Sequence, residues 1–193
     1  MRESPSSDES WSSFDGRVGM EGEMRVVALA PDVELTRELR DQLVERNLAA
    51  LAAVAALEER RSDTAEEDSA LHQEIARLDA KLNVLADLVN RLLAPASGLP
   101  ARQPVRFNAM GAVVPAELLP AGLPDGSPML LRLHLDACPS LPLELPAHCV
   151  RRLDDARLFL AFDPMPEAAS DAIERLVFRH HRRKVAEARH LGD

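Results

Sequence analysis

A basic run near the C-terminus contains the residues best suited to hold a charged ligand. Residues 179–184 read Arg-His-His-Arg-Arg-Lys, and guanidinium and ammonium groups at this density can bind phosphate groups or the carboxylates of an acidic partner. The candidate binding residues are Arg179, Arg182, Arg183 and Lys184. Basic side chains near a helix C-terminus also oppose the helix dipole, so an ordinary solvated helix end is the alternative interpretation.

Sequence motifs of catalysis and metal binding are absent. The chain contains no glycine-rich phosphate loop, nucleophile elbow, His-Glu-x-x-His run or Cys-x-x-Cys pair. His148 precedes Cys149 and His180 precedes His181, but adjacent side chains point apart, which does not suit a shared metal. Cys138 and Cys149 are expected to be reduced, inert thiols. We therefore predict no catalytic residues, no metal, no cofactor and no enzyme activity.

Composition restricts the partners of this chain. Its 193 residues carry a formal net charge of −9, which disfavours binding to nucleic acid and to anionic membranes. Hydrophobic residues make up 46% but aromatic residues only 3%, which predicts an aliphatic core without platforms for stacking bases. The sequence has no long uncharged apolar stretch, and its acidic, Ser-rich start differs from a secretory signal. A cytoplasmic location is therefore expected.

Four segments differ in composition along the chain. Residues 1–23 contain six serines and scattered acids, and are predicted to form a flexible N-terminal tail. Residues 24–30 form a short apolar segment with β-branched residues in its middle, which predicts the first strand. Residues 31–95 predict a long helical region, because its interior lacks Pro and Gly and is dominated by Ala, Leu, Glu and Arg. Residues 96–193 contain recurrent Pro and Gly and short alternating runs, which predict a sheet.

A heptad pattern within the helical region is the strongest signal in the sequence. Apolar residues recur with spacings of four and three over residues 71–92, as in a coiled coil. An amphipathic helix that covers its own domain is the alternative. The predicted oligomerisation seam consists of Leu71, Ile75, Leu78, Leu82, Leu85, Val89 and Leu92.

The helical region has two candidate arrangements. Thr64 and Glu67 fit a capping box, which predicts two helices divided near residues 62–67, whereas one bent helix is the alternative. Apolar residues beside the seam widen it beyond a two-helix contact and favour a homotetramer over a dimer sheathed by other helices. The earlier helix, rich in Ala and Leu, is the candidate sheath. Its apolar positions are Leu39, Leu43, Leu48, Leu51, Val54 and Leu57.

Short runs of alternating hydrophobicity after residue 95 predict a small antiparallel barrel or sandwich of about five or six strands, counting residues 24–30. A terminal helix over residues 171–190, begun by Ser170 or Asp171, is expected to cover it. The fold class is therefore α+β. The later strands are predicted at residues 105–107, 112–114, 129–135, 141–145, 149–153 and 157–162.

Three local features resemble the PilZ domain family, whose members bind or respond to the bacterial messenger cyclic di-GMP. Residues 106–112 lie where the family has its D/N-x-S-x-x-G strand-turn motif, residues 158–163 are similar to its closing strand, and the basic helix follows. The resemblance implies a six-stranded PilZ-like barrel with a C-terminal helix, interrupted by long inserted coiled-coil helices. This chain would then be an atypical, self-assembling member.

The motif residues depart from the family pattern. Arg106 stands where the motif has an acid and Asn108 where it has Ser, while Gly111 is retained. The family's R-x-x-x-R loop before the first strand, which clamps phosphate and stacks on guanine, has no counterpart around Arg17 or Arg25. Two arginines supply both the bidentate phosphate grip and the stacking surface. The resemblance therefore implies weak or absent binding of cyclic di-GMP.

Three functions are consistent with these features. The first is a non-catalytic adaptor in a cyclic di-GMP pathway that acts through an unidentified signalling protein in motility, surface attachment or virulence, as the resemblance implies. The second is a direct cyclic di-GMP receptor in which Arg102 joins Arg179, Arg182 and Arg183 in a non-standard phosphate site. The third, ranked last, is a coiled-coil protein that binds nucleic acid through the basic helix.

Overall fold

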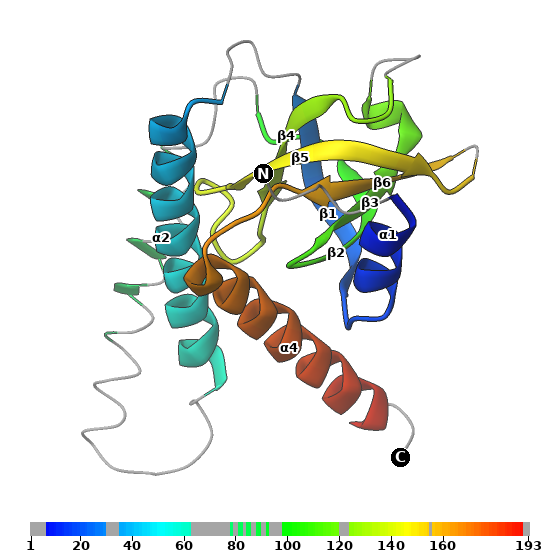
Figure 1. The fold of residues 1–193 in the computed structure, drawn as a ribbon. Helices are drawn as coiled ribbons and strands as arrows, with labels where there is room; N and C mark the ends of the chain where they lie inside the picture. The colour runs from blue at the N-terminus through cyan, green and yellow to red at the C-terminus, as the bar shows by residue number, and fades with distance from the viewer. Residues whose placement is uncertain are drawn as a thin grey trace.

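Six antiparallel strands form a closed barrel, with helices packed outside it, in the computed structural model of the protein (Figure 1). The structure describes residues 7–29, 35–62, 98–119, 124–154 and 156–190. It also describes helical positions between these ranges, namely 78, 81, 82, 84, 85, 88, 89 and 92. The predicted six-stranded antiparallel barrel with a C-terminal helix is confirmed.

The strands follow one another around the barrel in the order β1, β2, β3, β6, β5, β4. Closure pairs β1 with both β2 and β4, so that the barrel presents no free edge. A short 3-10 helix at Ala116–Leu118 follows β3. The strands are β1 (Met20–Leu29), β2 (Arg102–Asn108), β3 (Gly111–Pro115), β4 (Pro128–His134), β5 (Leu143–Arg152) and β6 (Arg157–Phe162).

Gly111 begins β3 at a point where two strands approach closely. A Cβ atom at this position would lie 2.3 Å from the Leu160 carbonyl oxygen and 2.8 Å from the Phe159 ring. Both distances are shorter than real side chains tolerate, so the pairing of β3 with β6 requires glycine here. The glycine of the motif is therefore explained by packing within the barrel.

Helix α2 (Arg37–Ser62) lies against the outside of the barrel. Thr36 caps its start, because its Oγ1 accepts a hydrogen bond from the Leu39 N–H at 3.3 Å. The buried Asn47 side chain then pairs with β5 as a strand would. Its Nδ2 donates to the Glu144 carbonyl at 2.8 Å, and its Oδ1 accepts from the Glu144 N–H at 2.7 Å. These bonds fix where α2 stands on the sheet.

The apolar face of α2 covers the barrel, which differs from the predicted sheath around a coiled coil. Leu43, Leu51 and Val54 are buried, and Leu57 packs against the core. The Ala and Leu content correctly predicted a helix, but helix periodicity does not say which neighbour will cover the apolar face. The barrel does so here.

Helix α4 (Glu167–His190) crosses the barrel and extends past it (Figure 1). It begins four residues before the predicted start at residue 171, because the Pro166 carbonyl accepts hydrogen bonds from the Ala169 and Ser170 N–H groups. Ile173, Leu176 and Val177 are buried on the barrel as predicted. Val185 and Ala188, expected on the same face, are exposed.

Two strand predictions need correction. Strand β1 begins at Met20 instead of residue 24, because Met20 to Met24 pair with β2. The predicted strands at residues 141–145 and 149–153 are one continuous strand, β5. Pro146 lies within this strand, where its carbonyl accepts a hydrogen bond from the Asp163 N–H at 2.8 Å and its missing donor is tolerated within the ladder.

Within the predicted flexible tail over residues 1–23, the described part forms regular structure. Residues Ser7–Asp15 form helix α1. Trp11 and Phe14 of this helix pack on Phe159 of β6, with ring centroids 5.3 Å and 4.9 Å from it. Phe14 is fully buried. Burial of aromatic side chains against the barrel supplies the stabilisation that the serine-rich composition lacks.

The heptad seam falls only partly within the described residues. Leu71 and Ile75 lie outside them, as does the predicted division near residues 62–67. Leu78, Leu82, Leu85, Val89 and Leu92 are helical, and between 45% and 75% of each is exposed. Their association into a coiled coil stays a prediction.

Candidate functional site

The turn between β2 and β3 carries the motif residues Arg106, Asn108 and Gly111. Asn108 is only 2% exposed. Its Nδ2 donates to the Phe14 carbonyl at 3.0 Å, and its Oδ1 accepts from the Met110 N–H at 2.9 Å. The bond to the Phe14 carbonyl holds the end of α1, and the bond from the Met110 N–H closes the turn. Each polar atom of the amide therefore already has a partner within the chain, although Asn108 also lines the pocket described below.

Arg106 is likewise held by the N-terminal region. Its Nη1 donates to Asp15 Oδ1 at 2.7 Å, and its Nη2 donates to the Asp15 carbonyl at 3.1 Å. Its Nε lies 3.2 Å from Glu21 Oε1. The guanidinium also stands over the Phe14 ring, 4.9 Å from the centroid. The positive charge that replaces the acid of the motif is thus neutralised and stacked by the chain's own residues.

Sequence reasoning missed α1, which supplies most of these partners. The helix is short and rich in Ser, a residue with modest helix propensity. One signal was available, because Trp11 is the single tryptophan of the chain and Phe14 follows it three residues later. Two aromatic side chains at helical spacing are typical of a segment that buries one face. A flexible tail seldom needs them.

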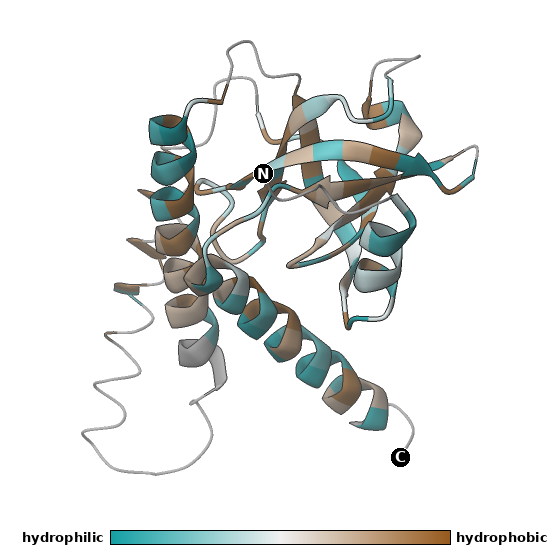
Figure 2. Ribbon diagram, viewed as in Figure 1, coloured by the Kyte–Doolittle hydropathy of each residue, from teal (hydrophilic) through white to brown (hydrophobic). Residues whose placement is uncertain are grey.

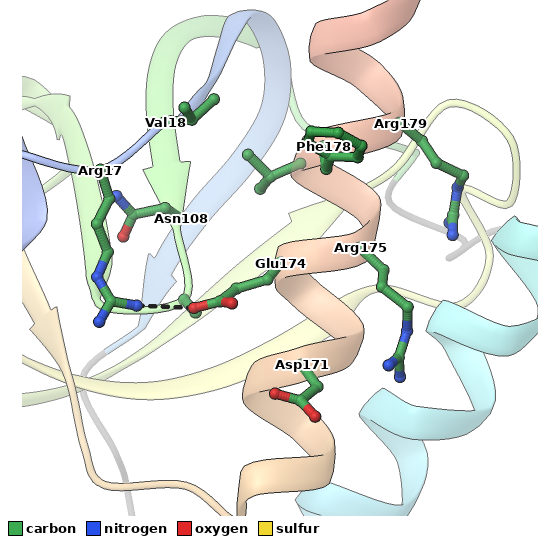
Figure 3. Close-up of a pocket in the computed structure, with 10 residues that line it drawn as sticks. Arg17, Val18, Asn108, Asp171, Glu174, Arg175, Phe178 and Arg179 are labelled. Atoms are coloured by element: carbon green, nitrogen blue, oxygen red, sulfur yellow. Dashed lines mark hydrogen bonds and ion pairs between the residues drawn. The ribbon is translucent and has the colours of Figure 1, made fainter.

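A pocket of about 680 Å³ lies between the loop before β1, the β2–β3 turn and α4 (Figure 3). Its apolar lining includes Val18, Ala109 and Phe178. The Arg17 Nη1 and Glu174 Oε1 atoms are 2.7 Å apart and form an ion pair at its edge. Arg17, the single arginine of the loop before β1, is therefore already paired with a carboxylate.

The basic run on α4 divides into two groups. Arg179 and Arg183 both reach Glu58 of α2, at 3.4 Å and 2.9 Å. Arg182 and Lys184 are exposed and make no ion pair within the described part of the chain. The run is therefore partly a structural link between α2 and α4. That role could not be read from local sequence, because Glu58 is more than 120 residues away.

Arg102 and Arg183 do line one cavity together, of about 580 Å³, but acids surround them. Arg102 Nη2 lies 2.7 Å from Asp136 Oδ1, and its Nη1 donates to the Glu23 carbonyl at 2.7 Å. Carboxylates oppose the binding of a phosphate diester. The acidic residues that line this cavity are Glu21, Glu23, Glu58, Asp136 and Glu187.

The histidine and cysteine pairs do not converge. His148 lies 3.3 Å from Asp163, whereas the adjacent Cys149 is buried, and burial raises the pKa of its thiol. Burial, reinforced by nearby Arg183 and Lys184, lowers the pKa of His180. Among the described residues no group of three or more His, Cys, Asp or Glu side chains could hold a metal ion. No helix in that same part of the chain is long and apolar enough to cross a membrane.

Comparison with known families covers strands β2 to β6 and α4. The family model described as "Atypical PilZ domain, cyclic di-GMP receptor" matches residues 49–190. The chain belongs to this atypical PilZ family. The match leaves out α1 and β1, so the helix that holds Arg106 and Asn108 lies outside the matched residues. The predicted resemblance to the PilZ family is confirmed.

One solved structure shares this fold over nearly its whole length. It is a pathogenic protein from Xanthomonas campestris, described as a tetrameric PilZ domain self-assembled via an unusual helical bundle. The TM-score is 0.70 at 23% sequence identity, and the alignment covers 93% of this chain and 97% of that one. No curated protein matches the chain. At this identity the likeness concerns the PilZ fold.

Proposed function

We propose that this atypical PilZ protein is a non-catalytic adaptor in a cyclic di-GMP pathway, which self-assembles through its helices, acts on protein partners, and binds the dinucleotide weakly or not at all. The observation that carries the proposal is the closure of the β2–β3 turn by α1. Arg106 is paired with Asp15 and stacked on Phe14, and Asn108 is bonded to the Phe14 carbonyl. Cyclic di-GMP would have to break these contacts to use the turn.

Electrostatics support the same conclusion. A doubly anionic dinucleotide needs arginines that are free to grip phosphate and to stack on guanine. Arg17 is paired with Glu174 and Arg102 with Asp136, while Arg179 and Arg183 share Glu58. Each of these four arginines already has a carboxylate partner, whereas the candidates Arg182 and Lys184 make no ion pair with a described residue. Binding would therefore exchange existing ion pairs for new ones and add little free energy.

Self-assembly is supported by the exposed heptad positions. Leu78, Leu82, Leu85, Val89 and Leu92 would leave a continuous apolar stripe in water if the chain stayed alone. Burial of such a side chain is worth roughly 1.5 to 3 kcal/mol. The tetrameric assembly of the Xanthomonas campestris protein through a helical bundle supports a homotetramer here. The adaptor would then display several barrels at once. It would act in the cytoplasm, in the control of motility, surface attachment or virulence.

Titration calorimetry with cyclic di-GMP tests the proposal. We expect no saturable heat from the purified full chain, beside a PilZ protein with an intact motif as positive control. Saturable heat with a micromolar or lower dissociation constant would overturn the adaptor function and favour a direct cyclic di-GMP receptor. In that event Arg183→Ala and Arg106→Ala separate the two candidate surfaces. The first removes a charge from the cavity that Arg102 and Arg183 line, and the second removes one from the β2–β3 turn.

A further inference from the structure

The solvent-facing side of α4 carries a regular row of exposed residues. They recur with spacings of four and three, which places them on one face of a helix. The opposite face, with Ile173, Leu176 and Val177, is buried on the barrel. We call the exposed set the α4 outer row. It consists of Arg175, Phe178, Arg182, Val185 and Arg189.

Phe178 is the unusual member of the row. It is 58% exposed, although aromatic side chains are scarce in this chain and the other four phenylalanines are buried. Val18, 54% exposed, lines the same pocket beside it (Figure 3). Val185 continues the apolar positions one heptad further, where Figure 2 shows hydrophobic residues persisting on the part of α4 beyond the barrel. An exposed aromatic flanked by arginines is typical of a protein contact.

The charges of the row have no ion-pair partner among the residues that the structure describes. Arg179 and Arg183 point to α2 and pair with Glu58, but Arg175, Arg182 and Arg189 make no ion pair with any described residue. The row itself carries three arginines and no acid, although the exposed Asp171 precedes it by one helical turn, in a chain whose net charge is −9. This helix face is therefore a positive strip on an acidic protein, and it selects for a partner that is locally negative.

We propose that the α4 outer row docks an acidic amphipathic helix of a protein partner. Apolar side chains of that helix would cover Phe178, Val18 and Val185, while its carboxylates would pair with Arg175 and Arg182. A row repeating every three and four residues over residues 175–189 is about 21 Å long at 1.5 Å per residue, which matches a partner helix of about four turns. The inference rests on the proposed function, because it names the kind of partner through which the adaptor acts.

Two other occupants fit less well. Nucleic acid is a polyanion without apolar side chains, so it would leave Phe178 and Val185 uncovered. The net negative charge of the chain would also repel it. A second copy of α4 packed antiparallel on the row would set Arg182 against Arg182 and Arg175 against Arg189. Like charges directly opposed are destabilising. An acidic helix satisfies both the apolar and the charged members.

Fluorescence anisotropy with a designed peptide tests the proposal on the full chain. The probe is a fluorescein-labelled, stapled 14-residue helix with Leu on one face and Glu on the flanks, and its matched counterpart carries Lys in place of Glu. We expect saturable binding of the acidic peptide and none of the basic one. Phe178→Ala and the double variant Arg175→Glu, Arg182→Glu should each weaken binding by about tenfold or more.

Two control variants keep the result specific. Leu141→Ala removes an exposed apolar side chain, 43% accessible, from the loop before β5, and Arg37→Glu reverses an exposed charge at the start of α2. Both should bind the acidic peptide as the parent does. Equal binding of the two peptides, no saturation at about 1 mM, or an undiminished affinity in Phe178→Ala overturns the proposal.

The remaining outcomes assign other occupants and also overturn it. Tighter binding of a duplex oligonucleotide than of the acidic peptide would assign the row to nucleic acid. A lower mass of Phe178→Ala in light scattering would assign it to contacts between copies. If the acidic peptide does not bind and cyclic di-GMP gives no saturable heat, the docking inference fails but the proposed adaptor function stands. Saturable heat with cyclic di-GMP refutes the adaptor function, whether or not the peptide binds.

Discussion

The β2–β3 turn and the outer faces of the helices differ in how their side chains are satisfied. At the turn, Asn108 is 2% exposed and Arg106 is paired and stacked within the chain. On the helices, Leu85, Leu92 and Phe178 are more than half exposed, and no described residue covers them. A surface whose polar groups are already bonded offers little new free energy to a ligand. Uncovered apolar side chains favour association with protein.

The largest effect is expected when the exposed apolar residues of the predicted seam are replaced by charged ones. Replacing Leu78 and Leu85 with Asp would bury unpaired carboxylates in the predicted seam. Each buried, unpaired carboxylate should destabilise the assembly by several kcal/mol. We expect light scattering to show a single chain of 21.2 kDa for the double variant and a larger assembly for the parent.

Val84→Asp is the matched control for the seam. Val84 is 69% exposed on the same stretch of helix but stands off the heptad row. It should keep the mass of the parent. If Leu78→Asp, Leu85→Asp keeps that mass as well, or if Val84→Asp dissociates the assembly equally, the seam is wrongly assigned.

The other side of the comparison is tested at α1. Phe14→Ala removes a fully buried ring from the contact with Phe159 and Arg106, and should cost about 3 kcal/mol. Release of α1 would move Trp11 from Phe159 into water, so we expect a red shift of tryptophan emission and a lower midpoint in urea. Ser13→Ala, on the exposed face of α1, should change neither. An unshifted spectrum for Phe14→Ala would mean that α1 does not depend on this ring.

A smaller loss is expected where α2 is attached to the sheet. Asn47→Ala removes two hydrogen bonds and leaves the backbone groups of Glu144 without these partners, which should cost about 2 kcal/mol. Urea unfolding measures this loss, with Gln42→Ala on the exposed side of α2 as control. Equal stabilities of the two variants would show that the apolar face of α2 alone sets its position.

The smallest effect concerns acid sensitivity. A hydrogen bond from His148 and then the pairing with Arg40 lower the pKa of Asp163, against the opposing effect of its burial. A carboxyl whose pKa is lower in the folded state stabilises the fold above its unfolded value and loses that contribution as pH falls through the folded value. The free energy of unfolding should therefore fall below about pH 4.

Asp163→Asn isolates this contribution. The variant should be less stable than the parent by about 1 kcal/mol at neutral pH, because the ion pair with Arg40 is lost, and the two should converge in acid. Asp171→Asn, which changes an exposed carboxyl of α4, should follow the parent at every pH. A constant gap between Asp163→Asn and the parent down to pH 2 would contradict the assignment.

Local pattern was sufficient for most of the barrel. Alternating Leu131 and Leu133 in β4, and the Gly and Pro residues between short runs, predict strands because side chains alternate across a sheet. Local pattern was insufficient at β5, where pairing on both sides carries Pro146 through the strand. A strand's tolerance for proline depends on which of its groups face a neighbour, and that is a property of the whole sheet.

The site divides in the same way. The sequence by itself determined helix α2, the spacing of the heptads, the basic run on α4 and the altered residues Arg106 and Asn108, because these depend on residue types and intervals along the chain. Only the tertiary structure decided that α1 closes the β2–β3 turn, that Arg179 and Arg183 share Glu58, and that Phe178 faces solvent. Each of these depends on segments far apart in the sequence meeting in space, and local propensity does not encode such contacts.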